Sequence, residues 1–344
     1  MEIELVKYHG LGNDFLVLVD DATGRASKDP TDGTRDVERR IGSALVRALC
    51  DRHHGIGADG MLRVRALGPG RVAMELFNAD GGAAETSGNG LRCAALAAVE
   101  AHLVAGTEMD VETLAGTVHA VVASQPYPGV ADVQVEMGVV EVGPELALAE
   151  LREPDASRWS TLSGGAGDGS WQDVLASLAG HRARRVAVGN PHLVLYGDPR
   201  RAAPANAAPG RAGAARIASI GPALEAAVAG GVNVELVEVR GDGPSLALEV
   251  WERGVGVTLA CGSGSCAAAA AARAAGLVGD VVEVVNPGGS LRVELSGDPA
   301  SASAVLTGPA RRVGRVRLDT DELLRAARGE PLPGWSATRS VDRP

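Results

Sequence analysis

Two stretches of the chain, FNADGGAAETSGNG at residues 77–90 and WERGVGVTLACGSG at residues 251–264, have the same length and share one plan. Their last two glycines coincide when the stretches are aligned, and each stretch leads into an apolar, helix-like run. Ser87 of the first stretch falls on Cys261 of the second. The pair predicts a repeated unit whose two copies differ in one chemically important side chain.

Further landmarks of the chain repeat at almost the same offset. Asn13 has a counterpart in Asn190, 177 residues later, and three other pairs are 174 residues apart: Asp59 with Asn233, Asn78 with Glu252, and Ser87 with Cys261. We interpret these pairs as an internal duplication, with chance matches in an Ala/Gly-rich chain as the alternative. A duplication predicts two similar domains that face each other across a cleft, with Ser87 and Cys261 on opposite walls.

Short β-branched or alternating runs dominate the chain, and Gly, Pro and Asp turns separate them, which predicts strands. The expected strands are residues 3–9, 15–20, 61–67, 71–77, 118–124, 132–138, 185–190, 192–197, 232–240, 246–252, 281–285, 291–296 and 315–319. Two further runs, after residues 90 and 264, are apolar almost all the way round. They predict helices that are enclosed by sheet and that begin just after a polar residue and a G-x-G element.

Length, charge and hydropathy limit the class of protein. A chain of 344 residues suggests two domains or one large one, and a net charge of −10 argues against a nucleic-acid partner. No run approaches 18 apolar residues, and the start, MEIELVKYHG, lacks the layout of a signal peptide. We therefore expect a soluble, cytoplasmic protein with no membrane partner.

The cysteines and lysines bear on cofactors. Cys50, Cys93, Cys261 and Cys266 form no C-x-x-C pair and no Cys/His cluster at metal spacing, so we expect free thiols and no metal. The chain has two lysines, neither in a Schiff-base motif, and its G-x-G elements lack the third glycine of a nucleotide site. We expect no cofactor.

A cysteine at a helix N-terminus has a distinct chemistry. The helix dipole and free N–H groups lower a thiol pKa from about 8.5 towards roughly 3.5–7.5, so we expect Cys261 to form a thiolate near neutrality. The same N–H groups bind a carboxylate. Two such helix ends, face to face, suit removal of a proton α to a carboxylate from one side and its return on the other. This is racemisation without a cofactor.

Together, the motifs resemble the diaminopimelate epimerase family, whose members convert LL-2,6-diaminoheptanedioate to the meso isomer on the route to lysine and peptidoglycan. The resemblance implies an α+β fold of two pseudo-symmetric domains, each a mostly antiparallel sheet curled round a central helix. It runs from residue 7 to about residue 310. The matching motifs are KYHGLGNDF (7–15), CDRHHGIGADG (50–60), FNADGGAAETSGNGLRC (77–93), VGNPH (188–192), GVNVELVEV (231–239), WERGVGVTLACGSGSC (251–266) and LTGPA (306–310).

The resemblance also implies roles for particular residues. Cys261 would be one catalytic acid/base, Ser87 would stand in place of the other, and His192 would lie close to Ser87. Arg253 would pair with the distal carboxylate of an amino-acid substrate, and the family often forms homodimers. The remaining substrate-binding residues would be Gly88, Asn89, Gly262 and Ser263 through their N–H groups, and Asn13, Asn78, Asn190, Asn233 and Glu252.

We expect the first half at residues 1–138, completed by a returning strand at about 306–320, and the second half at 139–305. Three surface segments, 21–40, 154–182 and 199–215, have the composition of insertions or linkers. Residues 321–344 form a tail, which we expect to be disordered from about residue 327.

The chain departs from the family pattern at Val257, in place of a usual glutamate, and at Ser87. A serine hydroxyl is a poor base without help, and Cys93, six residues further on, points about 240° away on a helix. Three explanations stay open. In the first, Ser87 acts with help, for example from His192, in an epimerase of modified rate or substrate. In the second, Cys261 works alone, giving elimination or exchange without inversion. In the third, the serine was introduced deliberately, or the protein binds without turnover.

Overall fold

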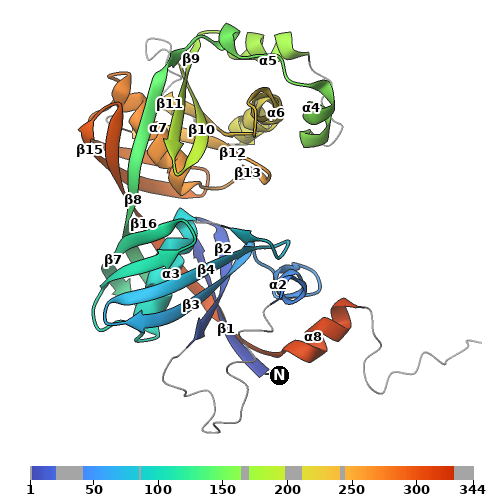
Figure 1. Cartoon of the computed structure of the whole chain (residues 1–344), viewed down its shortest axis with the longest axis vertical. Coiled ribbons are helices and arrows are strands. Elements are labelled where there is room, and N and C mark those ends of the chain that lie inside the picture. Colours follow the sequence, from blue (N-terminus) through green and yellow to red (C-terminus); the bar gives the residue numbers. More distant parts are fainter. Residues whose placement is uncertain are drawn as a thin grey trace, which may run out of the picture.

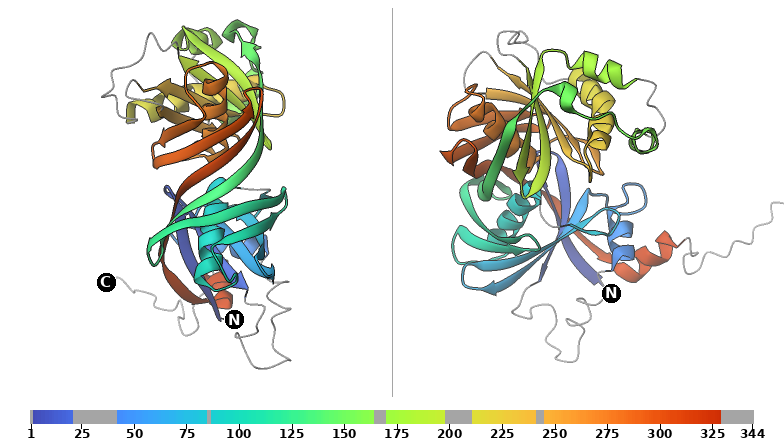
Figure 2. Two further views of the ribbon diagram at one scale, coloured as in Figure 1. Left: turned by 90° about the vertical axis from the view of Figure 1, so that its left-hand side faces the viewer. Right: turned by 45° about the horizontal axis from the view of Figure 1, so that its top comes forward.

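The computed structural model describes residues 2–20, 42–84, 87–163, 170–197, 211–240 and 245–328. Two halves lie one above the other (Figure 1), joined by two long strands, β8 (Val130–Leu146) and β16 (Ser301–Asp319). These strands pair antiparallel, and Figure 2 shows them twisting together from one half into the other. Their register shifts next to Gly138, whose φ of +79° places a bulge where β8 passes between the halves.

The strands of the first half form a closed ring. The ring closes because β8 pairs both with β7 and with β16, while β16 also pairs with β1. Short β5 (Ala83–Ala84) pairs with β4 outside the ring. In ring order the other strands are β7 (Gly116–Tyr127), β6 (Glu108–Thr113), β4 (Arg71–Asn78), β3 (Gly60–Gly68), β2 (Asn13–Asp20) and β1 (Glu2–Gly10).

The second half repeats this plan and uses the same two long strands. Its ring runs from β8 through β9 to β15 and back to β16, with short β13 (Gly256–Thr258) attached to β12. The expectation of two curled, mostly antiparallel sheets is therefore confirmed. The strands are β9 (His181–Val188), β10 (Asn190–Gly197), β11 (Asn233–Val239), β12 (Ser245–Glu252), β14 (Val281–Asn286) and β15 (Gly289–Asp298).

Each ring encloses one helix, α3 (Gly88–Glu100) in the first half and α7 (Gly262–Ala274) in the second. Residues 93–98 and 266–272 are buried on every side, as their all-round apolar sequence predicts. Most of these side chains are alanine, which lets the strands close tightly round the helix. Met137 of β8 packs against both cores and links them.

Further helices cover the outside of the rings (Figure 2): α2 and α8 on the first half, α4 to α6 on the second. The segment 154–182, expected as an insertion or linker, contains α4 and α5 in its described parts, and residues 211–215 begin α6. Residues 21–41, 198–210 and the tail beyond Arg328 lie outside the described residues. The bounds are α2 (Ser43–Cys50), η1 (Leu148–Glu150), α4 (Ala156–Leu162), α5 (Trp171–Ser177), α6 (Arg211–Ala227) and α8 (Thr320–Ala327).

Every expected strand overlaps a strand of the structure. The division at residues 138 and 139 stays a prediction. Within the described ranges, no helix has the length and apolar character needed to span a membrane.

Candidate active site

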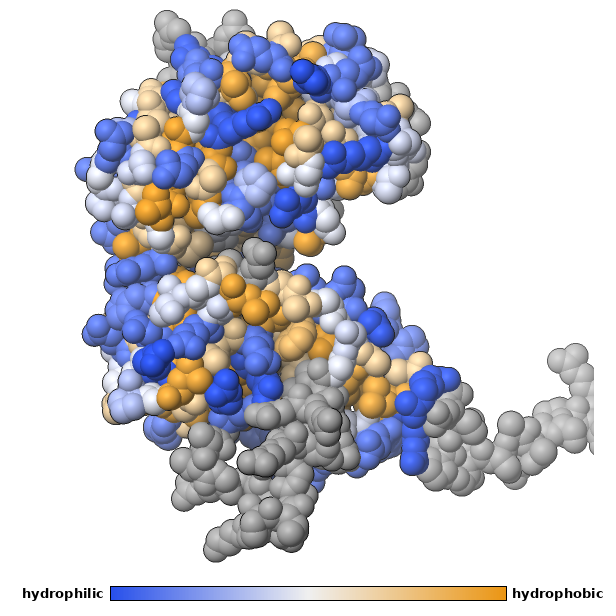
Figure 3. Space-filling view, viewed as in Figure 1, coloured by the Kyte–Doolittle hydropathy of each residue, from blue (hydrophilic) through white to orange (hydrophobic). Residues whose placement is uncertain are grey.

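The N-termini of the two central helices meet at the junction of the halves (Figure 1). Figure 3 shows that the surface is hollowed between the halves on one side. A Cβ on Gly88 would lie 3.3 Å from the Cα of Gly262, and a Cβ on Gly262 would lie 3.2 Å from the Cα of Gly88. Leu306 of β16 approaches both glycines. The close approach leaves little room for a side chain at either glycine, and it places the two helix starts opposite each other.

Ser87 and Cys261 are the N-caps of these helices. The Ser87 Oγ accepts a hydrogen bond from the Gly90 N–H at 3.1 Å, and the Cys261 Sγ accepts one from the Gly264 N–H at 3.3 Å. The helices therefore begin at the first glycine of each G-x-G, not after it as the sequence suggested, because the capping side chain sets the first turn. The first N–H groups of each helix keep no partner within the helix.

Cys261 lies in acidic surroundings. The charge of the Glu252 carboxylate acts on the thiol, and this carboxylate accepts a hydrogen bond from the Thr258 Oγ1 at 2.5 Å. Burial raises the pKa of the thiol most, and the charges of Glu252 and Glu235 raise it further. Together these effects outweigh the hydrogen bonds from Ser263 and Gly264, which lower the pKa. The expectation of a low pKa is wrong for this structure, because removal from water and two carboxylates oppose the helix N-terminus.

Glu235 was not predicted from the sequence. Its Oε1 lies 2.6 Å from His192 Nδ1, and the Nε2 of His192 lies 2.8 Å from the Asn190 Oδ1. Both side chains of the pair are fully buried, and the Oε2 of Glu235 has no hydrogen-bond partner in the described part of the chain. The available signal was an acidic residue at the centre of an apolar strand. The expected position of His192 beside Ser87 stays a prediction.

Asn13 and Asn89 lie together. Asn13 donates to the Asp59 carboxylate at 2.9 Å and accepts from the Asn89 amide at 3.1 Å. Asn89 also donates to the Ala260 carbonyl at 3.0 Å, one residue before Cys261. This hydrogen bond joins the two halves beside the helix starts.

Asn233 and Arg253 form a second group of predicted residues. The Asn233 side chain accepts a hydrogen bond from the Arg253 backbone N–H at 2.8 Å, and the Arg253 guanidinium donates to the Gly230 carbonyl at 3.4 Å. Asn78 is exposed at the end of β4, and Val257 is exposed on β13. The structure does not bring Asn78 into a hydrogen bond with the other predicted residues that it describes.

Arg92 is a buried cation beneath the start of α3, and it too was not predicted. Its guanidinium donates to the Gly88 carbonyl, to the Asn89 Oδ1 at 2.6 Å and to the Pro309 carbonyl. All three acceptors are neutral, and burial lowers the pKa of Arg92 to about 10. We call the start of α3 the Ser87 wall and the start of α7 the Cys261 wall. The positive charge of Arg92 lies near the Ser87 wall, whereas the carboxylates of Glu252 and Glu235 lie near the Cys261 wall.

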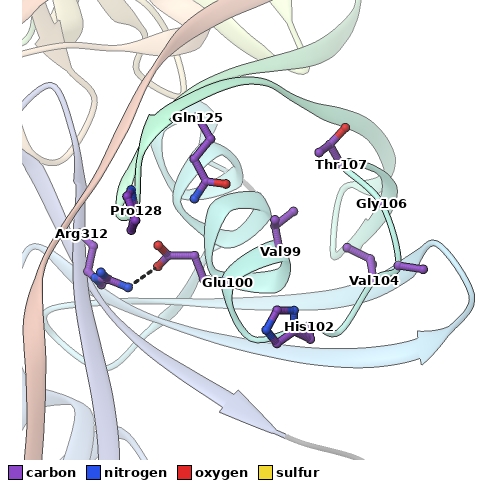
Figure 4. Close-up of a pocket in the computed structure, with 10 residues that line it drawn as sticks. Val99, Glu100, His102, Val104, Gly106, Thr107, Gln125, Pro128 and Arg312 are labelled. Carbon is purple, nitrogen blue, oxygen red and sulfur yellow. Dashed lines mark hydrogen bonds and ion pairs between the residues drawn. The ribbon is translucent and has the colours of Figure 1, made fainter.

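A pocket of about 480 Å³ lies at the other end of α3 (Figure 4). It contains the ion pair of Glu100 with Arg312, at 3.0 Å, and Tyr8 donates to the same carboxylate at 2.8 Å. The helix rise of 1.5 Å per residue separates this pocket from Ser87 by about 20 Å. It holds none of the predicted site residues. Across the described ranges, no group of His, Cys, Asp and Glu is arranged to hold a metal ion.

Comparison with known proteins gives a consistent result. A family model described as "Diaminopimelate epimerase" matches residues 5–142 and 185–313. The diaminopimelate epimerase of Erythrobacter litoralis is 36% identical over 93% of this chain and 98% of its own length. That of Desulforudis audaxviator is 34% identical over 90% of this chain and 97% of its own length.

Solved structures share the fold at low identity. A probable proline racemase from Agrobacterium radiobacter has a TM-score of 0.61 at 19% identity, covering 92% of this chain and 93% of that chain. A predicted epimerase from Pseudomonas aeruginosa has a TM-score of 0.56 at 19% identity, covering 92% of this chain and 99% of that chain. These similarities support the two-ring architecture.

Proposed function

The chain belongs to the diaminopimelate epimerase family, a family of isomerases, and we propose that it converts LL-2,6-diaminoheptanedioate to the meso isomer without a cofactor. One observation carries the proposal: two helix N-termini meet through Gly88 and Gly262, and their caps are Ser87 and Cys261. An amino acid bound between them has an acid/base group on each side and N–H donors for its carboxylate.

Cys261 acts as the base after it loses its proton to Glu252. Burial raises the pKa of Glu252, which makes this carboxylate a stronger base than an exposed one, and its charge already acts on the thiol. The thiolate is stabilised by the Gly264 N–H and the Ser263 hydroxyl. It removes the α-proton, and the electron pair of the broken C–H bond moves into the α-carboxylate, held by the helix N–H groups.

Ser87 completes the reaction by giving a proton to the opposite face of the α-carbon. The serine hydroxyl is a poor base but needs only to donate in this direction, and the Gly90 N–H, which already donates to its oxygen, stabilises the charge that remains there. Cys261 now carries the α-proton, so loss of the proton from Glu252 to solvent and uptake of a proton by Ser87 restore the enzyme. Arg253 and the asparagines bind the remainder of the substrate.

A one-base reaction is the second candidate, and the serine itself favours it. Among the residues that the structure describes, two carboxylates act on Cys261, Glu252 and Glu235. Cys261 would then exchange the α-proton without inverting the centre, or start an elimination.

For either reaction, we place the protein in the cytoplasm as a homodimer, with the domain division at residues 138 and 139.

Proton NMR of LL-2,6-diaminoheptanedioate in D₂O separates the candidates. Loss of the α-proton signal together with formation of the meso isomer supports inversion by Ser87 and Cys261. Loss of the signal without meso product supports the one-base reaction. A folded protein that causes no exchange contradicts both.

A further inference from the structure

Helix α4 brings a second arginine to the predicted substrate residues. A Cβ on Gly231 would lie 2.8 Å from the Cδ of Arg253 and 3.3 Å from the Nη2 of Arg158, so the two side chains lie side by side over this glycine. Gly231 has a φ of +78° and precedes Asn233 by two residues. Arg158, Gly231, Arg253 and Asn233 are therefore contiguous.

The Arg158 side chain is held in this position. Its Nη1 donates to the Val228 carbonyl at 3.2 Å, at the end of α6, and α4 packs against α6 (Figure 1). Its backbone N–H donates to Asp155, the N-cap of α4. The residue is half-buried, so its guanidinium has lost part of its hydration already.

Neither guanidinium has an acidic partner among the residues that the structure describes. Arg158 and Arg253 donate to backbone carbonyls only, although the chain has 43 acidic residues and a net charge of −10. Two adjacent guanidinium groups repel each other unless an anion lies between them.

We propose that Arg158 determines specificity, by forming with Arg253 a two-arginine clamp for the distal carboxylate of a dicarboxylic amino acid. The inference rests on the proposed function and adds a residue to it. Arg158 lies in residues 143–184, outside the ranges that the family model matches. Paired guanidinium groups bind a carboxylate through several charge-assisted hydrogen bonds, which a single-carboxylate substrate does not use.

Binding of heptanedioate, measured by calorimetry on the full chain, tests the clamp without turnover. We expect Arg158→Gln to weaken binding about 10- to 100-fold, the range of a charge-assisted hydrogen bond, and Arg158→Lys to weaken it less. Arg152→Gln, on the exposed turn before α4, is the matched control and leaves binding unchanged. Hexanoate, with one carboxylate, should bind weakly to all four proteins.

Kinetics give a second readout. With LL-2,6-diaminoheptanedioate, Arg158→Gln should raise KM by a similar factor and change kcat little, because the clamp is remote from the reacting carbon. Unchanged heptanedioate binding in a folded Arg158→Gln protein overturns the clamp, even if the wild-type protein is active. Weakened binding with no α-proton exchange by the wild type supports the clamp and contradicts the proposed reaction.

Discussion

The starts of α3 and α7 have nearly the same backbone and opposite electrostatic surroundings. Ser87 and Cys261 are both extended, with φ and ψ of −148° and 123° against −123° and 121°, and each accepts from the N–H three residues later. Near Cys261 stand two carboxylates, whereas near Ser87 stands the buried guanidinium of Arg92. The duplicated backbone supplies two similar helix starts, and the surrounding side chains that the structure describes give them charges of opposite sign.

The largest effect is expected from Cys261→Ala. If the acidic wall carries the base, this change should slow α-proton exchange about 10³-fold, within the range of a lost general base. The NMR assay in D₂O measures it, and thermal unfolding checks that the fold persists. Exchange within tenfold of wild type would show that the Cys261 wall is not the basic one.

Ser87→Cys should make the two walls alike. We expect formation of the meso isomer to rise about tenfold or more, because a thiol exchanges its proton more readily than a serine hydroxyl near neutral pH. Ser87→Ala is the matched control: it should abolish the meso product while α-proton exchange continues. Meso product from the alanine variant would mean that Ser87 takes no part in inversion.

The halves also differ in how they hold their matching asparagines. Asn190 contacts the His192–Glu235 pair, whereas Asn13 is held by Asp59 within an ion cluster of Lys7, Asp14 and Arg52. Burial raises the pKa of Asp14, but hydrogen bonds from Arg52 and Lys7 outweigh it and bring the value to about 2. The cluster is thus a source of acid-sensitive stability in the first half.

The sign of that dependence follows from linkage. Because the folded pKa is below the unfolded value of about 3.9, the contribution is complete above about pH 5 and is lost as the pH falls through about 2. Asp14→Asn should therefore lower the free energy of unfolding by about 2 kcal/mol at pH 7 and by much less at pH 2. Urea denaturation at both pH values measures the difference, and an equal loss at both would exclude an ionic origin.

The smallest effect concerns the feature in which the two walls are most alike. A Cβ on Gly88 or on Gly262 meets the other glycine and the Leu306 side chain at 3.1–3.5 Å. Gly88→Ala and Gly262→Ala should each cost about 1 kcal/mol of stability, at the low end for overpacking because Leu306 and the facing backbone need to move by only a few tenths of an ångström. Thermal unfolding of the two variants compares the walls directly, and a large difference between them would contradict the symmetry of the contact.

Local patterns predicted most of the fold. Strands such as 71–77 were predicted because alternating polar and apolar residues indicate a strand with one buried face. The central helices were predicted because their sequences are apolar all round. The strand β6 was missed since its sequence, EMDVET, is largely charged, and α6 because Ala, Pro and Arg suggested an insertion. The expected strands 132–138 and 315–319 are parts of β8 and β16, whose continuation past the bulge at Gly138 depends on pairing between distant segments.

The site was less predictable than the fold. Spacing identified the caps Ser87 and Cys261, but the pKa of Cys261 depends on Glu235 and Glu252, which approach it only in the folded chain. Arg92 and Glu235 are charged residues within apolar elements, and a sequence does not say which of these stays buried. Arg158 lies in a segment that composition alone marked as an insertion.

The sharing of β8 and β16 by both rings has a consequence for biosynthesis. β1 pairs with β16 from Glu2 with Asp319 onward, so the first strand made must wait for almost the last. The second ring closes only when β16 is made to about residue 307, where it pairs with β15, and the first ring only at about residue 319, so the earlier strands keep open edges meanwhile. Folding that depends on such distant contacts is slow, so both halves should close late and nearly together rather than one long before the other.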